Sequence, residues 1–282
     1  MKRKIMDFTK NIFENRQQRK LPFLAAHRGI CGGNIPCNTL ASYEIALRQG
    51  ADVVEIDVTR AKDGGLFVFH PGMEKVFLRS DRSISDMTTA EASELYLVNQ
   101  DSTRTGYRVP TLFEVLTFLK GKAYINVDKF WTDVKGISDE IRRAGVEDQV
   151  IVKTGTDEKS LEAVAKYAPD FMFMPIVKTE DRVTAELISK GVNVIDIEAI
   201  FETEDAPVIS DEYIKKMHDR GLLVWVNSIV YNEKAILSAG HTDDISLTKD
   251  PDLGWGWLID KNIDFIQTDW LLSLKEYTEG RR

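Results

Sequence analysis

The stretch GADVVEIDVTR, residues 50–60, places two carboxylates inside a run that otherwise has the composition of a buried strand. Successive strand residues point to opposite faces, so Val54, Ile56 and Val58 share one face and Glu55 and Asp57 share the other. Two like charges on one buried face repel each other unless something compensates them. The pattern therefore predicts either a bound metal ion or ion pairs with Arg28 or Lys153.

Further polar side chains stand at the ends of other strand-like runs. His27 and Arg28 follow FLAA, His70 ends LFVFH and Asp128 ends AYINVD. Three carboxylates from neighbouring strands form an all-oxygen site, which suits Mg²⁺ or Ca²⁺ better than zinc. Imidazole titrates near neutrality and suits general acid–base work, and an arginine can hold a phosphate by forked hydrogen bonds. A cation, an arginine and two imidazoles together indicate phosphoryl transfer, although each histidine alone could serve only structure.

Eight short apolar or β-branched runs alternate with helical patterns. The runs are the expected strands, and their ends must position the polar side chains. The runs span residues 23–27, 53–58, 123–128, 150–153, 171–177, 193–199, 222–227 and 265–269. One of the helices is expected from near Asn38 to Gly50. The alternation predicts a parallel (β/α)8 TIM barrel, in which active sites gather at the C-terminal ends of the strands. An open doubly wound sheet is the competing architecture, but polar residues on one parity of several strands favour the barrel.

Two segments interrupt this alternation, and we expect one barrel domain over residues 1–282 to contain both. LFVFH predicts an extra short strand, and the segment after it, about 71–109, is expected to form an excursion with one short helix near 89–96. The segment of about 241–262 is expected to be a polar loop that runs into a short helix near Leu253. Insertions of this kind usually decorate the rim of a barrel.

Composition and charge give information on the partners and the cellular location of the protein. The chain has 282 residues and a formal net charge of −8, which argues against nucleic acid as a partner. Residues 2–19 form an amphipathic pattern that includes Ile5 and Phe8, which predicts an N-terminal helix. This segment lacks the apolar core of a secretory signal, and no window is apolar enough for a stable membrane anchor. The chain as given therefore indicates a cytoplasmic protein, or an exported one whose signal has been removed; it does not indicate an oligomeric state.

Two cysteines, Cys31 and Cys37, lie six residues apart in one expected loop. Two cysteines make neither a disulfide framework nor a cysteine-based metal site. Because cysteine density is so low, we expect both to be free thiols.

The order and spacing of these segments resemble the glycerophosphodiester phosphodiesterase family. The resemblance rests on AHRG, the stretch from IPCNTL to LFVFH, VPTLFEVL, INVDK, LVWVN and IQTD, and it covers roughly residues 22–275. It implies a (β/α)8 barrel that hydrolyses glycerophosphodiesters to glycerol 3-phosphate and an alcohol. It also implies a divalent cation, commonly Mg²⁺ or Ca²⁺.

Carried over by position, the resemblance implies three groups of site residues. They are the acid–base pair His27 and His70, the phosphate-binding Arg28, and the metal ligands Glu55, Asp57 and Asp128. The chain departs from the family pattern at three points. The third ligand is usually glutamate, Cys37 stands where the family usually has an acid, and Pro71 stands where the second histidine is usually followed by aspartate.

Four residues near the ends of later strands are expected to bind substrate: Lys153, Glu198, Trp225 and Asn227. Lys153 would add positive charge near the phosphate, and Trp225 would form an apolar wall for the glycerol or the leaving group. The sequence does not say which histidine is the acid. It also leaves open whether the nucleophile is water or a neighbouring glycerol hydroxyl, which would give a cyclic phosphate.

Two other functions compete with glycerophosphodiester hydrolysis. A lysophospholipase D or a phospholipase C-like enzyme would need an apolar surface, which the segment GWGWL, residues 254–258, could supply in part. A barrel that has lost catalysis and only binds phosphodiesters or a protein is the other alternative. Asp128 and Cys37 are its best support, whereas the retention of both histidines and the arginine argues against it.

Overall fold

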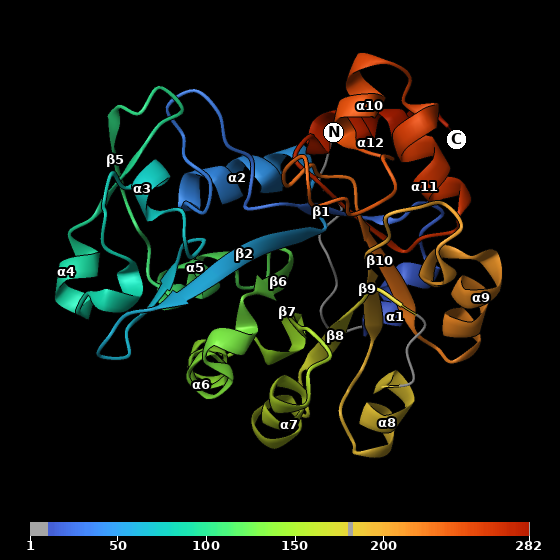
Figure 1. Ribbon diagram of the computed structural model, residues 1–282, viewed down its shortest axis with the longest axis horizontal. Coiled ribbons are helices and arrows are strands. Elements are labelled where there is room, and N and C mark those ends of the chain that lie inside the picture. The colour runs from blue at the N-terminus through green and yellow to red at the C-terminus, as the bar shows by residue number, and fades with distance from the viewer. Residues whose placement is uncertain (1–10, 180–182, 282) are drawn as a thin grey trace.

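Eight parallel strands close into a barrel in the computed structural model, which describes residues 11–179 and 183–281. The strands are Phe23–Ala26 (β1), Val53–Arg60 (β2), Tyr124–Asp128 (β6), Val150–Thr154 (β7), Met172–Val177 (β8), Asp196–Ala199 (β9), Leu223–Asn227 (β10) and Phe265–Thr268 (β11). They follow this order around the ring, and β1 pairs with both β11 and β2 to close it (Figure 1). The predicted (β/α)8 barrel is confirmed.

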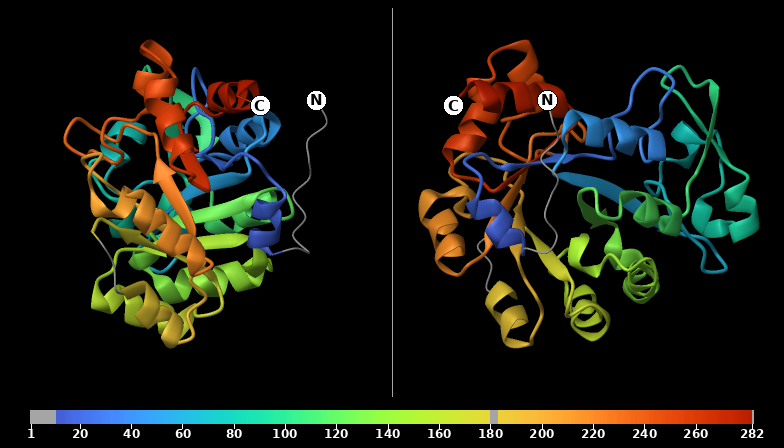
Figure 2. Two further views of the ribbon diagram at one scale, coloured as in Figure 1. Left: turned by 90° about the vertical axis from the view of Figure 1, so that its right-hand side faces the viewer. Right: turned by 180° about the vertical axis from the view of Figure 1, so that it is seen from behind.

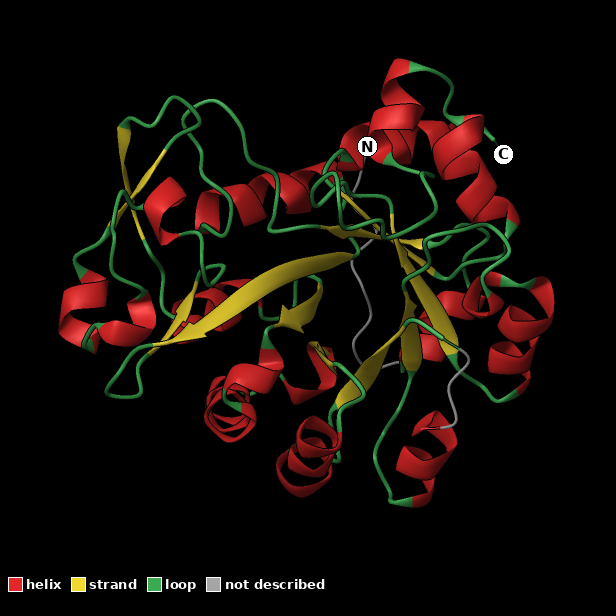
Figure 3. Cartoon of the chain, viewed as in Figure 1, coloured by secondary structure: helices red, strands yellow, loops and turns green. Residues whose placement is uncertain are grey.

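Helices surround the strands, as Figure 3 shows in red and yellow. They are Leu40–Gln49 (α2), Leu112–Leu119 (α5), Val134–Ala144 (α6), Glu158–Tyr167 (α7), Val183–Ser189 (α8), Asp211–Asp219 (α9) and Leu271–Gly280 (α12), with 3₁₀ turns at Phe130–Thr132, Glu147–Gln149 and Pro207–Ile209. The N-cap of α2 is Thr39, whose hydroxyl accepts from the backbone N–H of Ser42, and Gly50 ends the helix in the left-handed conformation. Asn38, the expected start, instead has φ 56° and turns its side chain toward the barrel.

The predicted alternation of faces along β2 is confirmed. Val54, Ile56 and Val58 belong to the large core between the strands and the surrounding helices. Burying a side chain of this size contributes roughly 1.5–3 kcal/mol. Glu55 and Asp57 lie on the other parity and are equally buried. One face of β2 therefore packs into the core, and the opposite face carries the two carboxylates toward the inside of the barrel.

A short helix closes the barrel at the N-terminal ends of its strands. Helix α1, Ile12–Gln17, places Ile12 in the same interior cluster as Phe23 at the start of β1, and the left view of Figure 2 shows α1 in blue beside the strand ends. The Arg16 guanidinium pairs with Asp264 at 2.7 Å. The predicted N-terminal helix is therefore present in part, and Ile5 and Phe8 lie outside the described residues.

The excursion after β2 forms a small lobe beside the barrel, at the left of Figure 1. It contains Leu66–Val68 (β3), Glu74–Phe77 (α3), the 3₁₀ turn Ile84–Asp86, Thr89–Ser93 (α4), Tyr96–Val98 (β4) and Arg104–Arg108 (β5). The extra strand β3 and a short helix at Thr89 were predicted, whereas the antiparallel pair β4–β5 was not. An apolar cluster that includes Phe67 of β3 and Ile84 holds the lobe together, and β3 pairs with β2 of the barrel. This cluster supports the proposal that the chain forms one domain.

The second insertion is more helical than expected. Asp243–Thr248 (α10), the π-helical turn Asp252–Gly256 and Trp257–Asp260 (α11) replace most of the predicted polar loop. Trp255 is only 2% exposed, so GWGWL does not present a continuous apolar surface, although Leu253 beside it is exposed. Within the described residues, no helix is both long and apolar enough to cross a membrane.

The expectation of two free thiols was wrong, because a disulfide joins Cys31 and Cys37. The backbones of Gly32 and Ile35 exchange two hydrogen bonds of 3.0 Å, so the loop between the cysteines doubles back on itself. The two Cα atoms are thereby brought within 4.9 Å, in the usual range for a disulfide. Cysteine density carries no information about such a turn.

Candidate active site

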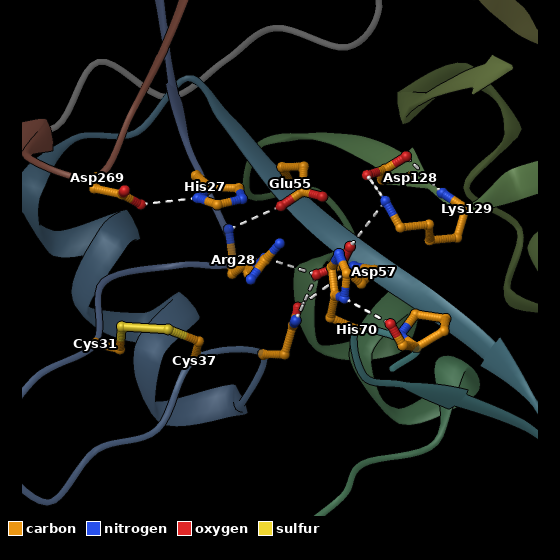
Figure 4. A network of polar contacts seen from close by, with 12 residues as sticks. His27, Arg28, Cys31, Cys37, Glu55, Asp57, His70, Asp128, Lys129 and Asp269 are labelled. Carbon is orange, nitrogen blue, oxygen red and sulfur yellow. Dashed lines mark hydrogen bonds and ion pairs between the residues drawn. A yellow bond between two sulfur atoms is a disulfide. The ribbon is translucent and has the colours of Figure 1, made fainter. Parts of the chain in front are cut away.

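The predicted catalytic and metal-binding residues converge at the C-terminal mouth of the barrel (Figure 4). His27 and Arg28 directly follow β1, and His70 comes two residues after β3. Asp57 of β2 is in register with Asp128 at the end of β6. Pairing of β2 with β1, β3 and β6 explains how side chains distant in sequence reach one place.

The three acidic residues form a compact cluster. Glu55, Asp57 and Asp128 each offer a carboxylate oxygen, and these oxygens lie within 4.8 Å of one another. Burial, together with the charges of Asp57 and Asp128, raises the pKa of Glu55 to about 7. Among the described residues, the buried Oδ1 of Asp57 has no hydrogen-bond partner. An all-oxygen cluster with an unpartnered buried oxygen fits a hard divalent cation.

Arg28 compensates one side of this cluster. Its Nε lies 2.9 Å from Oδ2 of Asp57, and its backbone N–H donates to Oε2 of Glu55 at 2.9 Å. Asn38 donates a further hydrogen bond of 2.9 Å to the same Asp57 oxygen. The ion pair between Asp57 and Arg28, one of the two arrangements left open by the sequence, is therefore present. It uses only Oδ2 of Asp57 and leaves the remaining oxygen for a cation.

His27 is held by an acidic residue that the sequence reasoning did not single out. Nδ1 of His27 lies 2.8 Å from Oδ1 of Asp269, which directly follows β11. Burial alone would lower the pKa of His27, but the hydrogen bond to Asp269 and the charge of Glu55 outweigh it and raise that pKa. The buried Asp243 in turn accepts from the backbone N–H of Asp269 at 2.9 Å, which fixes the position of Asp269.

His70 has the opposite electrostatic setting. Burial, with the nearby charges of Arg28 and Lys129, lowers the pKa of His70. Its Nδ1 lies 2.9 Å from the backbone oxygen of Pro71. A carbonyl oxygen can only accept, so Nδ1 carries the hydrogen and Nε2 holds a free lone pair. Nε2 is buried and has no hydrogen-bond partner in the described part of the chain. The neutral ring can therefore take up a proton at Nε2.

Lys129 is a second residue that the sequence reasoning missed. Its Nζ lies 2.8 Å from Oδ2 of Asp128 and 3.9 Å from Oδ1 of Asp57. Burial would raise the pKa of Asp128, but the charges of Lys153 and Lys129 outweigh it and hold that pKa well below its usual range. Asp128 is therefore ionised throughout the neutral range.

The chain is similar in sequence to an uncharacterized protein and to several glycerophosphodiester phosphodiesterases. Over 236 residues, 76% of this chain and 90% of the relative, the chain is 27% identical to the uncharacterized protein YqiK of Bacillus subtilis. Over 143 residues, it is 29% identical to a glycerophosphodiester phosphodiesterase of Caldanaerobacter subterraneus, and this match spans 50% of this chain and 52% of that enzyme. The chain is thus similar in sequence to several glycerophosphodiester phosphodiesterases. Residues 173–278 also match DUF4996, a domain of unknown function.

Solved structures agree on the fold. A glycerophosphoryl diester phosphodiesterase from Parabacteroides distasonis superposes with a TM-score of 0.78 at 22% identity, covering 98% of this chain and 93% of that one. A phosphodiesterase from Oleispira antarctica, solved in complex with the product sn-glycerol-3-phosphate, superposes with a TM-score of 0.63 at 18% identity, covering 92% and 97%. At identities this low, the superpositions show that the fold is shared and do not identify the substrate of this protein.

The four residues expected to bind substrate form a buried network inside the barrel. Nζ of Lys153 lies 3.1 Å from Oε2 of Glu198 and 4.0 Å from Oδ1 of Asp128. Asn227 donates to Glu198 at 2.7 Å and accepts from the indole N–H of Trp225 at 3.0 Å. Lys153 therefore connects this network to the acidic cluster.

Trp225 lies deeper in the barrel than a substrate wall requires. It is fully buried and stacks on Phe265 in the interior cluster, with ring centroids 5.1 Å apart. This position favours a packing role. The substrate contacts of Lys153, Glu198 and Asn227 stay predictions.

Two of the three departures from the family pattern, Cys37 and Pro71, lie at or next to residues that line one small cavity at the mouth. This cavity is lined by Arg28, Pro36, Cys37, Asn38, Phe69, His70, Phe77 and Leu97. Cys37 lines this cavity with sulfur bonded to Cys31, where the family usually has an acid. Pro71 supplies the carbonyl that fixes the tautomer of His70. These two departures leave Arg28 and His70 in place at the mouth of the barrel.

Proposed function

We propose that this protein hydrolyses glycerophosphodiesters, in a cation-dependent reaction that releases glycerol 3-phosphate and an alcohol. The observation that carries the proposal is the convergence of Arg28, His27 and His70 on the carboxylate cluster at the barrel mouth. Sequence similarity to glycerophosphodiester phosphodiesterases supports the same reaction class. The related Oleispira barrel was solved with sn-glycerol-3-phosphate, which is the product expected here.

Glu55, Asp57 and Asp128 would hold the divalent cation, Mg²⁺ or Ca²⁺. When bound, such a cation offsets negative charge on the phosphoryl oxygens of the substrate. Arg28 contributes a guanidinium that is always charged, and from its place beside Asp57 it would bind the same oxygens. The phosphodiester is thus bound by positive charge and stabilised as its charge builds up in the transition state.

We infer different roles for the two histidines from their environments. Nε2 of His70 is the base, since it has a free lone pair in a ring kept neutral by burial and neighbouring cations. It accepts the proton of the attacking oxygen, which belongs to water or to the neighbouring glycerol hydroxyl. His27 is the acid, because Asp269 stabilises its protonated form. It donates a proton to the leaving alkoxide.

Hydrolysis of a lysolipid is the second candidate function. Exposed aromatic side chains border the site: Tyr231 is 50% exposed with its ring 6.1 Å from that of His70. Trp131, 40% exposed, lies under Nζ of Lys129 at 5.2 Å, and the exposed Trp270 directly follows Asp269. Such side chains favour a leaving group with apolar surface. Assay of glycerophosphocholine beside lysophosphatidylcholine separates the two candidates.

The test is a panel of water-soluble glycerophosphodiesters assayed with Mg²⁺, with Ca²⁺ and with chelator, reading out glycerol 3-phosphate. We expect cation-dependent release, and a fall of roughly 10²–10⁴ in kcat for His27→Ala. His218→Ala is the matched control, because His218 pairs with Asp264 at the opposite end of the barrel. Undiminished turnover by His27→Ala would remove the proposed acid, and no turnover by the wild type on any diester would leave the barrel a binding protein.

The disulfide between Cys31 and Cys37 is evidence on the cellular location of the protein. Such bonds persist mainly in oxidising compartments. We therefore propose that of the two locations compatible with the sequence, export is favoured over the cytoplasm. Fractionation of the native host with an antibody against the protein tests this.

A further inference from the structure

The ammonium group of Lys129 lies inside the carboxylate cluster that is proposed to bind the cation. Nζ is 2.8 Å from Oδ2 of Asp128 and 3.9 Å from Oδ1 of Asp57. Figure 4 shows it between these two carboxylates. The side chain is only 20% exposed, so water screens these contacts weakly.

The backbone explains how this residue reaches the cluster. A residue that follows the last position of a strand normally points to the opposite face from its predecessor. Lys129 instead has φ 60° and ψ 20°, the left-handed conformation that a residue other than glycine adopts at a cost. The chain bends there, and both the backbone N–H and the ammonium of Lys129 turn back to Asp128. A strained backbone is therefore used to place a cation on a carboxylate.

Lys129 occupies the oxygens that a divalent cation would need. Oδ1 of Asp128 accepts from the backbone N–H of Lys129 at 2.6 Å, and Oδ2 accepts from its ammonium. Oδ2 of Asp57 is taken by Arg28. The only other lysine contact of Asp128 among the described residues is Lys153 at 4.0 Å. Arg28 and Lys129 therefore already offset part of the negative charge of the three carboxylates, whereas Lys153 is shared with Glu198 at 3.1 Å.

We propose that Lys129 is an internal counter-ion that competes with the divalent cation for Asp128 and Asp57. In the cation-free protein its ammonium compensates the carboxylates, and a divalent cation binds Oδ2 of Asp128 only when that ammonium leaves it. Lys129 thereby lowers the affinity of the site for the cation and sets the concentration at which the protein becomes active. This inference rests on the cation site of the proposed function.

Isothermal titration calorimetry of chelator-treated protein with Ca²⁺ and Mg²⁺ tests the competition directly. Lys129→Met removes the ammonium and keeps the aliphatic stem, and Lys129→Gln is the second variant in case the first does not fold. We expect the Kd of either variant to be at least about tenfold lower than that of the wild type, since a unit charge that lies 2.8 Å and 3.9 Å from two ligand oxygens is removed. Lys135→Met is the matched control, because Lys135 is exposed and pairs with Asp139.

The outcomes separate this inference from the proposed function. If folded variants bind the cation with unchanged or weaker affinity than the wild type, the competition is refuted, whether or not the protein hydrolyses diesters. If the variants bind and the wild type does not, the competition stands, and the proposed cation dependence of the wild type is refuted. A structural role alone for Lys129 predicts a loss of affinity, which is the opposite sign.

Discussion

The pairing of His27 with Asp269 makes a specific kinetic prediction for Asp269→Asn. The contact is 2.8 Å long and joins an imidazole that is 13% exposed to a carboxylate that is 46% exposed. A hydrogen bond to a charged group contributes about 1.5–3 kcal/mol, and the exposure of Asp269 places this one near the lower end. We therefore expect kcat to fall roughly tenfold, compared with the larger loss for His27→Ala.

The pH dependence of the same variant gives a second readout. Asp269 raises the pKa of His27, so its loss lowers that pKa. Because the protonated ring is the active form of an acid, the alkaline limb of the kcat profile should move to lower pH by roughly one unit. The assay is initial-rate hydrolysis of one glycerophosphodiester with saturating cation. Asp139→Asn, an exposed acid paired with Lys135, is the control.

A double-mutant cycle decides whether Asp269 acts through His27. If it does, adding Asp269→Asn to His27→Ala should cost almost nothing further. An equal tenfold loss in both backgrounds, or an alkaline limb that does not move, would refute the pairing as the reason for the acid role of His27. A purely structural contribution of Asp269 would lower thermal stability and leave the profile unchanged.

Three further predictions follow from other contacts. Arg28→Ala should lower kcat by roughly 10²–10³, since one preorganised donor to the phosphoryl oxygens is lost, and steady-state kinetics measure this. Asp196→Asn should raise the free energy of unfolding at pH 7 by roughly 1–3 kcal/mol, because both oxygens of this fully buried carboxylate lack partners among the described residues and burial raises its pKa. A carboxyl group whose pKa is higher in the folded than in the unfolded state lowers the stability of the protein as pH rises above its unfolded-state pKa. The stability that Asp196→Asn gains over the wild type should therefore grow from about pH 4 to pH 7 and vanish at lower pH, and thermal unfolding measures this. Replacing Cys31 and Cys37 together by serine should lower the free energy of unfolding by about 2 kcal/mol, as expected for closing a short loop, and a denaturation midpoint unchanged from that of the wild type would contradict this.

Local patterns made the barrel predictable. Alternation along β2 was sufficient to divide Val54 and Ile56 from Glu55 and Asp57, since a strand has a fixed period of two. Convergence of residues from different strands followed from the parallel barrel, whose strand ends meet at one mouth. These inferences needed only the order of the elements.

The partner of His27 was missed although a signal existed. Asp269 is 242 residues away in sequence, but it follows the last strand, and closing a barrel places that strand beside the first. An acid after β11 could therefore have been paired with a histidine after β1. No sequence signal predicted the contact of Lys129 with Asp128, because it depends on a left-handed backbone conformation that a lysine rarely adopts. The disulfide likewise depends on a turn between Cys31 and Cys37.

The central claim is that the carboxylate cluster and the two histidines together hydrolyse a glycerophosphodiester. The most direct measurement is release of glycerol 3-phosphate from such a diester by the wild type, by the wild type with chelator, and by Glu55→Gln at the same protein concentration. We predict release by the wild type that chelator abolishes and a cation restores, with Glu55→Gln reduced at every cation concentration. Release that is indifferent to chelator and to Glu55→Gln would contradict the account.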